Sequence, residues 1–331
     1  MKEHRTAEQL TFSVIVPTYG RAAQLRDCLR GLGELDFPRD RFEVIVVDDG
    51  GNPPAELTLR EPPAPFRLAV MTAPHAGPGA ARNAGARHAC GRFLAFLDDD
   101  CTPAPDWLGA LEARFAATPD RAIGGRTLNA LPRNLCAAAS EALHTYIYSY
   151  YNADPGAARF LASNNFAVPA AAFRAIGGFN PIFGTVPSED REFCHRWLRR
   201  GHAMTYSPEA VVYHARPLTL RSFCKQHFNY GCGAFYFHTL RARDGDGRVR
   251  LESASFYLNL FRSAFTEASG PRACALAMLI AVTQTANAAG FLWSKLRQPQ
   301  RGSDRPFRTD ERRKERVDHC TDDRGATAWN G

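Results

Sequence analysis

The stretch FLAFLDDD, residues 93–100, joins an apolar run of strand length to three consecutive carboxylates. Neighbouring like charges repel by about 1 kcal/mol or more per pair once they are partly desolvated, so the triplet predicts a cation at the end of a strand. Carboxylate oxygens favour Mg²⁺ or Mn²⁺ over zinc. For an isolated triplet, an acidic turn in solvent is the alternative.

Two earlier apolar runs also end in polar residues. FSVIVP (12–17) is followed by Thr18, and EVIVV (43–47) is followed by Asp48 and Asp49, with apolar residues at helical spacing between the two runs. Strand, helix and strand at this spacing predict a parallel sheet with helices on its faces. Ligands of such sheets bind at the carboxyl ends of the strands, so these polar groups are expected at one edge.

The composition fits a globular protein with one elaborated domain or two. The chain has 331 residues, of which 45% are hydrophobic and 23% are charged. Its net charge of +7 suits nucleic acid, an anionic membrane surface or phosphorylated substrates. We expect no nucleic-acid binding, because the basic segment 297–316 contains a single aromatic residue, Phe307.

The cysteines and the N-terminus favour a cytoplasmic protein. The nine cysteines form no Cys-x-x-Cys pair, which is typical of reduced thiols, and residues 1–10 have no apolar segment of the signal-peptide type. Residues 273–294 carry no charge, so this segment could span a membrane, lie at its inner face or be a buried helix.

Four regions follow from the pattern along the chain. We expect an N-terminal tail (1–10), an α/β domain (11–217), a helical C-terminal region in contact with a membrane surface (218–296) and a basic, disordered tail (297–331). The first strand is followed by neither Gly-x-Gly-x-x-Gly nor a Walker lysine loop, which argues against dinucleotide redox chemistry and against a P-loop ATPase.

Five stretches together resemble family 2 glycosyltransferases of the GT-A fold. They are SVIVPTYGR (13–21), EVIVVDDGG (43–51), GPGAARNAGARHACGRFLAFLDDD (77–100), SNNFAVPAAAFRAIGGFN (163–180) and SEDREFCHRWLRRG (188–201). The resemblance implies a mixed, mostly parallel central sheet flanked by helices. It also implies transfer of a sugar from a nucleotide-diphosphate donor, in the synthesis of polysaccharide, glycolipid or another cell-surface glycan.

The resemblance assigns roles to individual residues. For the donor it implies Pro17, Thr18, Tyr19, Arg21, Asp48, Asp49, Gly77, Arg82, Asn83, Asp98 and Asp99. For a Mn²⁺ or Mg²⁺ ion it implies Asp98, Asp100 and His214, and for the acceptor Ser163, Asn164, Gly178 and Phe179. A metal there would neutralise the leaving diphosphate. A strand-ending turn at Asp48-Asp49, a solvated Arg82 and a structural His214 are the alternatives.

The same resemblance implies that the Glu189-Asp190 pair supplies the general base, with Asp190 taking the proton of the acceptor hydroxyl. Direct displacement would invert the anomeric centre. Ser188 is expected to cap a helix, which would lower the pKa of Asp190 and weaken it as a base, whereas exclusion of water would act in the opposite direction. An acid at a helix start without a catalytic role is the alternative.

One departure from the family bears on the product. Processive members carry Gln-x-x-Arg-Trp, and residues 224–231 read CKQHFNYG instead. We therefore expect transfer of a single sugar to a glycan or lipid-linked acceptor. A non-catalytic subunit that binds nucleotide sugars is the alternative. A metal-dependent phosphohydrolase is disfavoured, because such an enzyme needs a lysine and further acidic residues downstream of its nucleophilic aspartate, and the sequence shows no such set.

Overall fold

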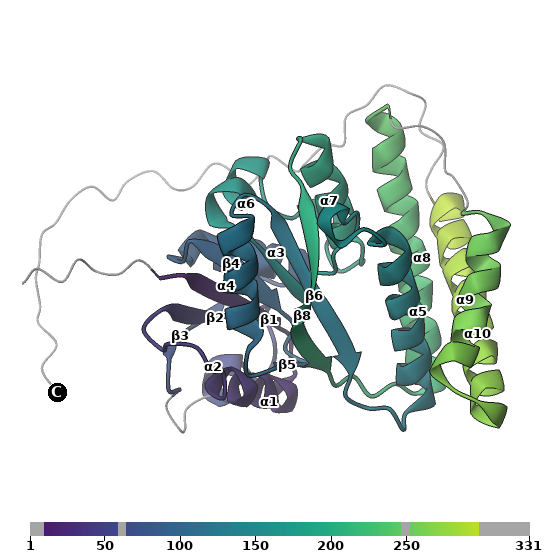
Figure 1. Cartoon of the computed structure of the whole chain (residues 1–331), viewed down its shortest axis with the longest axis horizontal. Coiled ribbons are helices and arrows are strands. Elements are labelled where there is room, and N and C mark those ends of the chain that lie inside the picture. The colour runs from purple at the N-terminus through teal and green to yellow at the C-terminus, as the bar shows by residue number, and fades with distance from the viewer. Residues whose placement is uncertain (1–9, 59–63, 246–251, 298–331) are drawn as a thin grey trace, which may run out of the picture. The chain divides into compact units, whose positions relative to one another are not determined.

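The structure is a computed structural model that describes residues 10–58, 64–245 and 252–297 (Figure 1). Its centre is an eight-stranded sheet in the order β3-β2-β1-β4-β7-β6-β8-β5. The strands are β1 (Phe12–Thr18), β2 (Phe42–Asp48), β3 (Arg67–Thr72), β4 (Phe93–Leu97), β5 (Cys101–Pro103), β6 (Ala122–Asn129), β7 (Asn165–Pro169) and β8 (Met204–His214).

The helices follow the strands for most of the chain and then continue alone. They are α1 (Ala22–Gly33), α2 (Ala55–Thr58), α3 (Pro78–His88), α4 (Trp107–Ala117), α5 (Leu135–Tyr151), α6 (Ala170–Ile176), α7 (Glu189–Arg199), α8 (Leu220–Arg243), α9 (Ala254–Glu267) and α10 (Gly270–Arg297), with 3₁₀ turns at Pro155–Ala157 and Pro181–Phe183. This mixed α/β architecture with a helical C-terminal region confirms the expected fold class.

The first half of the sheet is parallel, as the sequence predicts. β1 pairs with β2 on one side and with β4 on the other, and β3 lies outside β2. The chain therefore moves outward from β1 to β3 and then returns to the opposite side of β1. Parallel sheets open a crevice at such a reversal, which places the polar ends of β1, β2 and β4 around one space.

The second half of the sheet is mixed. β7 runs antiparallel to β4 and β6 antiparallel to β7, whereas β8 is parallel to β6 and antiparallel to β5. In the pairing of β5 with β8, Cys101 lies opposite His214. The backbone N–H of Ala215 also donates to the carbonyl of Asp100 at 2.8 Å. This register brings the last residue of the acidic triplet next to the histidine.

Each face of the sheet has its own core, because side chains alternate along a strand. Val14 and Val16 of β1 pack with α1 and α4 on one face, and Ile15 packs with α3, α6 and α7 on the other. A third cluster joins α5 to the C-terminal helices and includes Leu143 and Phe223. Figure 1 shows α8, α9 and α10 beside α5.

α10 contains the uncharged segment 273–294. By length and composition this helix is apolar enough to cross a membrane, although no lipid contact follows from that alone. Its buried residues recur every three or four positions or at multiples of that spacing, which marks a single packed face: Ala273, Leu276, Ile280, Thr283, Gly290 and Ser294. The segment is therefore buried along one face, and Met278 and Trp293 are exposed.

α3 packs closely on the sheet because its residues are small. A β-carbon at Gly85 would lie 2.6 Å from Cγ2 of Ile15, which is closer than real β-carbons come to other atoms, and 3.1 Å from Cγ2 of Val47, which is a tight contact. Gly109 in α4 has open space in the same position.

We expect Gly85→Ala and Gly109→Ala to change stability in opposite directions. The first should lower the free energy of unfolding by about 1 kcal/mol or more, because the overpacking of β1 and β2 outweighs the gain in helix propensity. The second should raise it by about 0.5–1 kcal/mol. Urea unfolding of both variants measures this, and a stabilised Gly85→Ala protein would contradict the close packing of α3.

Candidate active site

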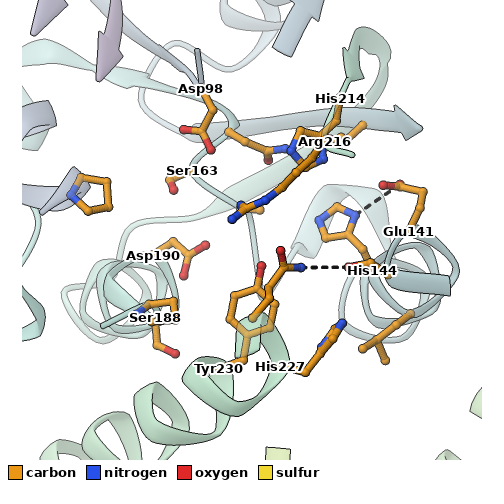
Figure 2. A pocket seen from close by; sticks show the side chains of 18 of the residues that line it. Asp98, Glu141, His144, Ser163, Ser188, Asp190, His214, Arg216, His227 and Tyr230 are labelled. Carbon is orange, nitrogen blue, oxygen red and sulfur yellow. Dashed lines mark hydrogen bonds and ion pairs between the residues drawn. The ribbon is translucent and has the colours of Figure 1, made fainter. Parts of the chain in front are cut away.

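The carboxyl ends of β1, β4 and β8 open into a cavity of about 400 Å³. Its wall also contains the start of α7 and residues from α5, α8 and α10. Figure 2 shows Asp98 and His214 on one side of this space, Asp190 on another and Tyr230 of α8 below them. The cavity is thus built by both the α/β part of the chain and the C-terminal helices.

Arg82 of α3 connects two acidic parts of the cavity. Its Nη2 contacts Oδ1 of Asp98 at 2.5 Å and its Nη1 contacts Oε1 of Glu189 at 2.9 Å. The guanidinium is buried and lies 5.7 Å from the ring centre of Phe179. Charge-assisted bonds of this kind are stronger than neutral ones, so Arg82 holds the end of β4 against the start of α7.

Asp99 is buried in a network with β1. Its Oδ2 accepts a hydrogen bond from Thr18 Oγ1 at 2.7 Å, and its Oδ1 lies 2.7 Å from Nη2 of Arg21. Burial raises the pKa of Asp99 to about 7, although Arg21 and Thr18 act against this rise. Asp99 therefore links the ends of β1 and β4, and it does not line the cavity.

Asp100 lies between two cationic side chains. Its Oδ2 contacts Nη1 of Arg21 at 2.7 Å, and its Oδ1 lies 3.3 Å from Nε2 of His214. Burial alone would raise the pKa of Asp100, but the hydrogen bond and charge of His214, together with Arg21, lower it. Burial opposes protonation of His214, and Asp100 more than offsets this, so the pKa of His214 is raised.

The residues of this corner fit a divalent cation. Ligand atoms of Asp100, Cys101 and His214 lie within 4.8 Å of one another. Burial raises the pKa of Cys101 well above its usual range, so its thiol stays protonated and is a poor ligand. The carboxylate suits Mn²⁺ or Mg²⁺, and the imidazole adds a nitrogen ligand that is more typical of transition metals than of Mg²⁺. Asp98 is not part of this group, and its Oδ1 is bound to Arg82 instead.

Asp190 lies in the first turn of α7 and lines the cavity. Its Oδ1 accepts from the backbone N–H of Arg191 at 2.7 Å, but burial has the larger effect and raises the pKa of Asp190. Burial beside Asp190 also raises the pKa of Glu189 to about 7. The sequence left open whether the helix start, which lowers the pKa of Asp190, or exclusion of water, which raises it, has the larger effect. In the structure, exclusion of water has the larger effect. Ser188 precedes the helix in a left-handed conformation and makes no side-chain cap.

Several residues with implied roles are held by bonds to the chain itself. Asp48 accepts from the backbone N–H groups of Gly51 and Ala55, and Asp49 from those of Ala76 and Gly77, at 2.7–2.9 Å. Tyr19 is exposed and stacks on His75 with ring centres 4.3 Å apart. His75 Nδ1 lies 2.9 Å from Oδ2 of Asp49, so Tyr19, His75 and Asp49 form one group beside β1.

The residues expected on the acceptor side divide into two pairs. Ser163 and Asn164 line the cavity, whereas Gly178 and Phe179 do not. Phe179 is fully buried, and its backbone exchanges two hydrogen bonds with the side chain of Asn83, at 2.7 and 2.9 Å. Phe179 packs against Arg82, and the side chain of Asn83, which is not among the lining residues, fixes this loop.

Several cavity residues lie outside the five matching stretches, and the sequence assigned them no place in the site. Arg216 follows β8, and in Figure 2 its guanidinium points into the cavity. Its charge acts on the pKa of both Asp100 and Tyr230, so it lies near both. Further lining residues are Glu141 and His144 of α5 and Gln226, His227 and Tyr230 of α8. Their helical spacing alone does not distinguish a cavity wall from a core.

The fold and the acidic crevice define a GT-A glycosyltransferase fold. The chain is similar to a mannosyltransferase from Pyrobaculum calidifontis in complex with GDP-Man and Mn²⁺, with a TM-score of 0.60 at 22% identity, over 87% of this chain and 88% of that one. It is also similar to residues 1–349 of TarS from S. aureus in complex with UDP-GlcNAc, with a TM-score of 0.51 at 17% identity, over 85% of this chain and 89% of that one.

The family follows from sequence comparison. Residues 13–177 match the model of glycosyl transferase family 2. The chain is 30% identical over 227 residues to the pre-mycofactocin glycosyltransferase of Mycobacterium tuberculosis. This match covers 67% of this chain and 46% of that protein. The chain thus belongs to glycosyltransferase family 2, and it spans about half the length of the curated relatives that it matches.

We expect Thr18→Val to destabilise the protein more at high pH than at low pH. Above about pH 7 Asp99 is ionised and its buried oxygen loses a donor, which should cost about 1–3 kcal/mol, whereas at pH 5.5 the carboxyl is protonated and the loss should be smaller. Chemical unfolding at pH 5.5 and 8.5 measures the difference. Thr266→Val, at an exposed hydroxyl of α9, is the control, and an equal loss at both pH values would contradict the charge assigned to Asp99.

Proposed function

We propose that the chain transfers one sugar from a nucleotide-diphosphate donor to an acceptor hydroxyl with inversion. The observation that carries this is the placement of two acidic centres on one cavity, with Asp98 and His214 at the strand ends and Asp190 on α7. Arg82 connects the two centres, because it forms ion pairs with Asp98 at the end of β4 and with Glu189, the residue before Asp190 on α7. One centre suits a departing diphosphate and the other suits an incoming hydroxyl.

The donor would occupy the side formed by β1, β2 and β4. Its base would lie by the exposed Tyr19, near Asp49, and its diphosphate would be bound by Arg21 and Arg216. Asp100 and His214 would hold Mn²⁺ or Mg²⁺, which supplies charge neutralisation for the leaving diphosphate. The structural relatives in complex with GDP-Man and UDP-GlcNAc support a donor of this class.

Asp190 would act as the general base. The acceptor oxygen forms a bond to the anomeric carbon while the bond from that carbon to the diphosphate oxygen breaks, and the hydroxyl proton passes to the carboxylate of Asp190. A raised pKa makes Asp190 a stronger base than an exposed aspartate, which supports this role. Attack on the face opposite the leaving group inverts the anomeric centre.

The acceptor would be a glycan or a lipid-linked glycan that receives one sugar at a time. Residues 11–217 would supply the donor side and the base, and residues 218–296 would complete the acceptor side. The departure of residues 224–231 from the processive motif supports single transfer. The expected tails at 1–10 and 297–331 fall almost wholly outside the described residues.

We expect Asp100→Ala and Asp190→Asn to separate donor binding from chemistry. Asp190→Asn should lower kcat by about 10²–10⁴-fold and leave donor affinity unchanged, because it removes only the proton acceptor. Asp100→Ala should weaken the Mn²⁺-dependent affinity for donor, because it removes a ligand. Calorimetry and turnover with UDP-, GDP- and dTDP-sugars measure both.

The exposed Asp120→Asn is the control for these variants. If the parent binds a donor without transfer or hydrolysis under any acceptor, the chain is a binding subunit and not an enzyme. If Asp190→Asn turns over like the parent, Asp190 is not the base.

We also propose that the protein contacts the inner face of the cell membrane through α9 and α10. Large apolar side chains are exposed on both helices: Leu258, Phe265, Met278, Leu292 and Trp293. The exposed apolar residues of α10 lie outside the packed face of that helix. The net charge of +7 would add attraction to an anionic surface.

Vesicle sedimentation tests this contact. The full chain should sediment with vesicles of phosphatidylglycerol and phosphatidylcholine, and a variant with Met278→Ser, Leu292→Ser and Trp293→Ser should remain in solution, since the apolar contact is lost. Ile182→Ser, at an exposed apolar residue outside α9 and α10, should sediment like the parent. A parent that stays in solution would exclude the contact.

A further inference from the structure

One face of α8 contributes a polar wall to the cavity. Gln226, His227 and Tyr230 all line it, and the spacing of three and four residues puts them on the same side of the helix. Figure 2 shows Tyr230 rising from α8 toward the centre of the cavity, with His227 beside it. We call these three residues, together with Asn164, which also lines the cavity, the α8 wall.

His227 is a buried side chain with two uncommitted nitrogens. It is 1% exposed, and among the described residues neither Nδ1 nor Nε2 has a hydrogen-bond partner. Its ring lies between the rings of Phe223 and Tyr230, with centres 4.6 and 5.5 Å away. Burial lowers the pKa of His227 to about 4, so the ring is neutral and presents one donor and one acceptor.

Gln226 and Asn164 each leave an oxygen without a partner. Nε2 of Gln226 donates to Oγ of Ser140 at 3.1 Å, which orients the amide, and its buried Oε1 has no partner in the described part of the chain. Nδ2 of Asn164 donates to Oγ1 of Thr127 at 3.3 Å, and Oδ1 of Asn164 is likewise buried without one. A buried polar group without a partner costs about 1–3 kcal/mol, so these atoms indicate a polar ligand.

Tyr230 lies where the two halves of the cavity meet. The charges of Arg216, Asp190, Asp98 and Asp100 all act on its hydroxyl, which places it near both acidic centres. Tyr230 is 39% exposed as a residue, but desolvation of its hydroxyl is the largest effect on its pKa and raises it to about 12, so the phenol stays protonated and can donate. A ligand on the α8 wall would thus lie next to Asp190.

The chemistry of the α8 wall selects between ligand classes. A hydroxyl donates and accepts, so it can satisfy an amide oxygen, an imidazole and a phenol together. A phosphate only accepts, and it would leave the oxygens of Gln226 and Asn164 without donors. Glu141 and His144 of α5 also line the cavity and lie 3.6 Å from each other, and Arg216 points into it.

We propose that the α8 wall binds an uncharged, hydroxyl-rich ring of the acceptor, a sugar or a cyclitol, and presents one of its hydroxyls to Asp190. Leu143 and Ile147 of α5 line the same cavity and would contact the C–H face of the ring. This assignment rests on the proposed function and specifies the acceptor of that site. The residues act by direct contact with the acceptor, so they should affect acceptor affinity and not donor affinity.

The test uses the full chain with Mn²⁺ and the nucleotide sugar that raises its Tm most. Methyl glucoside, methyl mannoside and myo-inositol are offered beside glucose 6-phosphate, mannose 6-phosphate and inositol phosphate. The uncharged rings should be glycosylated faster. Tyr230→Phe and Gln226→Leu should each raise the acceptor KM about tenfold and leave the donor KM and the rate of donor hydrolysis without acceptor unchanged. His227→Phe, which keeps a ring in the core, should do the same.

Tyr236→Phe, on the same helix but outside the cavity lining, is the matched control and should change none of these values. Preference for the phosphate esters, an unchanged acceptor KM in all three variants, or donor hydrolysis without transfer to any uncharged ring would overturn the assignment while the proposed function stands. A parent that neither binds nor hydrolyses any donor would overturn the proposed function, and this assignment with it.

Discussion

The contact of Arg82 with Asp98 and Glu189 is the interaction on which the site depends. Removing a guanidinium from water is costly, and two carboxylates within 2.9 Å offset that cost. The cation comes from α3, which reaches this depth because Gly85 lets it approach β1 and β2 closely. Packing of a small-residue helix therefore sets the position of the charge. That charge in turn fixes the start of α7, and with it Asp190, relative to the end of β4.

The acidic triplet is tolerated because its members have different partners. Asp98 pairs with Arg82, Asp99 pairs with Arg21 and accepts from Thr18, and Asp100 lies between Arg21 and His214. In the turn that follows β4, Asp98 lines the cavity, whereas Asp99 and Asp100 are buried. The sequence suggested that one bound cation offsets the repulsion among the three carboxylates. In the structure, arginine side chains of the chain itself also offset it. Asp99, which the motif does not explain, is the residue that connects β4 to β1.

The sequence predicted the parallel half of the fold well, because its strands are continuous apolar runs such as 12–17 and 93–97 with helical patterns between them. It did not predict how the later strands pair. β6 contains Gly124-Gly125 and shifts register at this point against β8, which lies about eighty residues further along the chain. Pairing over such a distance depends on the whole sheet and not on local pattern.

The site shows the same division between local and tertiary causes. The resemblance named Asp98, Asp100, Asp190 and His214; Asp98, Asp190 and His214 line one cavity, and Asp100 contacts His214. Asn83 and Phe179 lie in equally recognisable motifs, yet the structure uses them to hold a loop. Arg216 went unrecognised. Residues 224–231 of α8 were noted only as a departure from the processive motif, since a polar residue on a helix has the same spacing whether it faces water or a cavity.

The pKa of Asp190 shows why the C-terminal helices belong to the chemistry. A carboxylate at a helix start should be a weak base, and the backbone N–H of Arg191 does stabilise its charge. Burial has the larger effect, and burial at this position depends on what closes the cavity. α5 and α8 form walls of that cavity, so they exclude water that would otherwise solvate the carboxylate. The pKa of Asp190 is therefore set in part by residues outside its own motif, and some of them lie beyond residue 217.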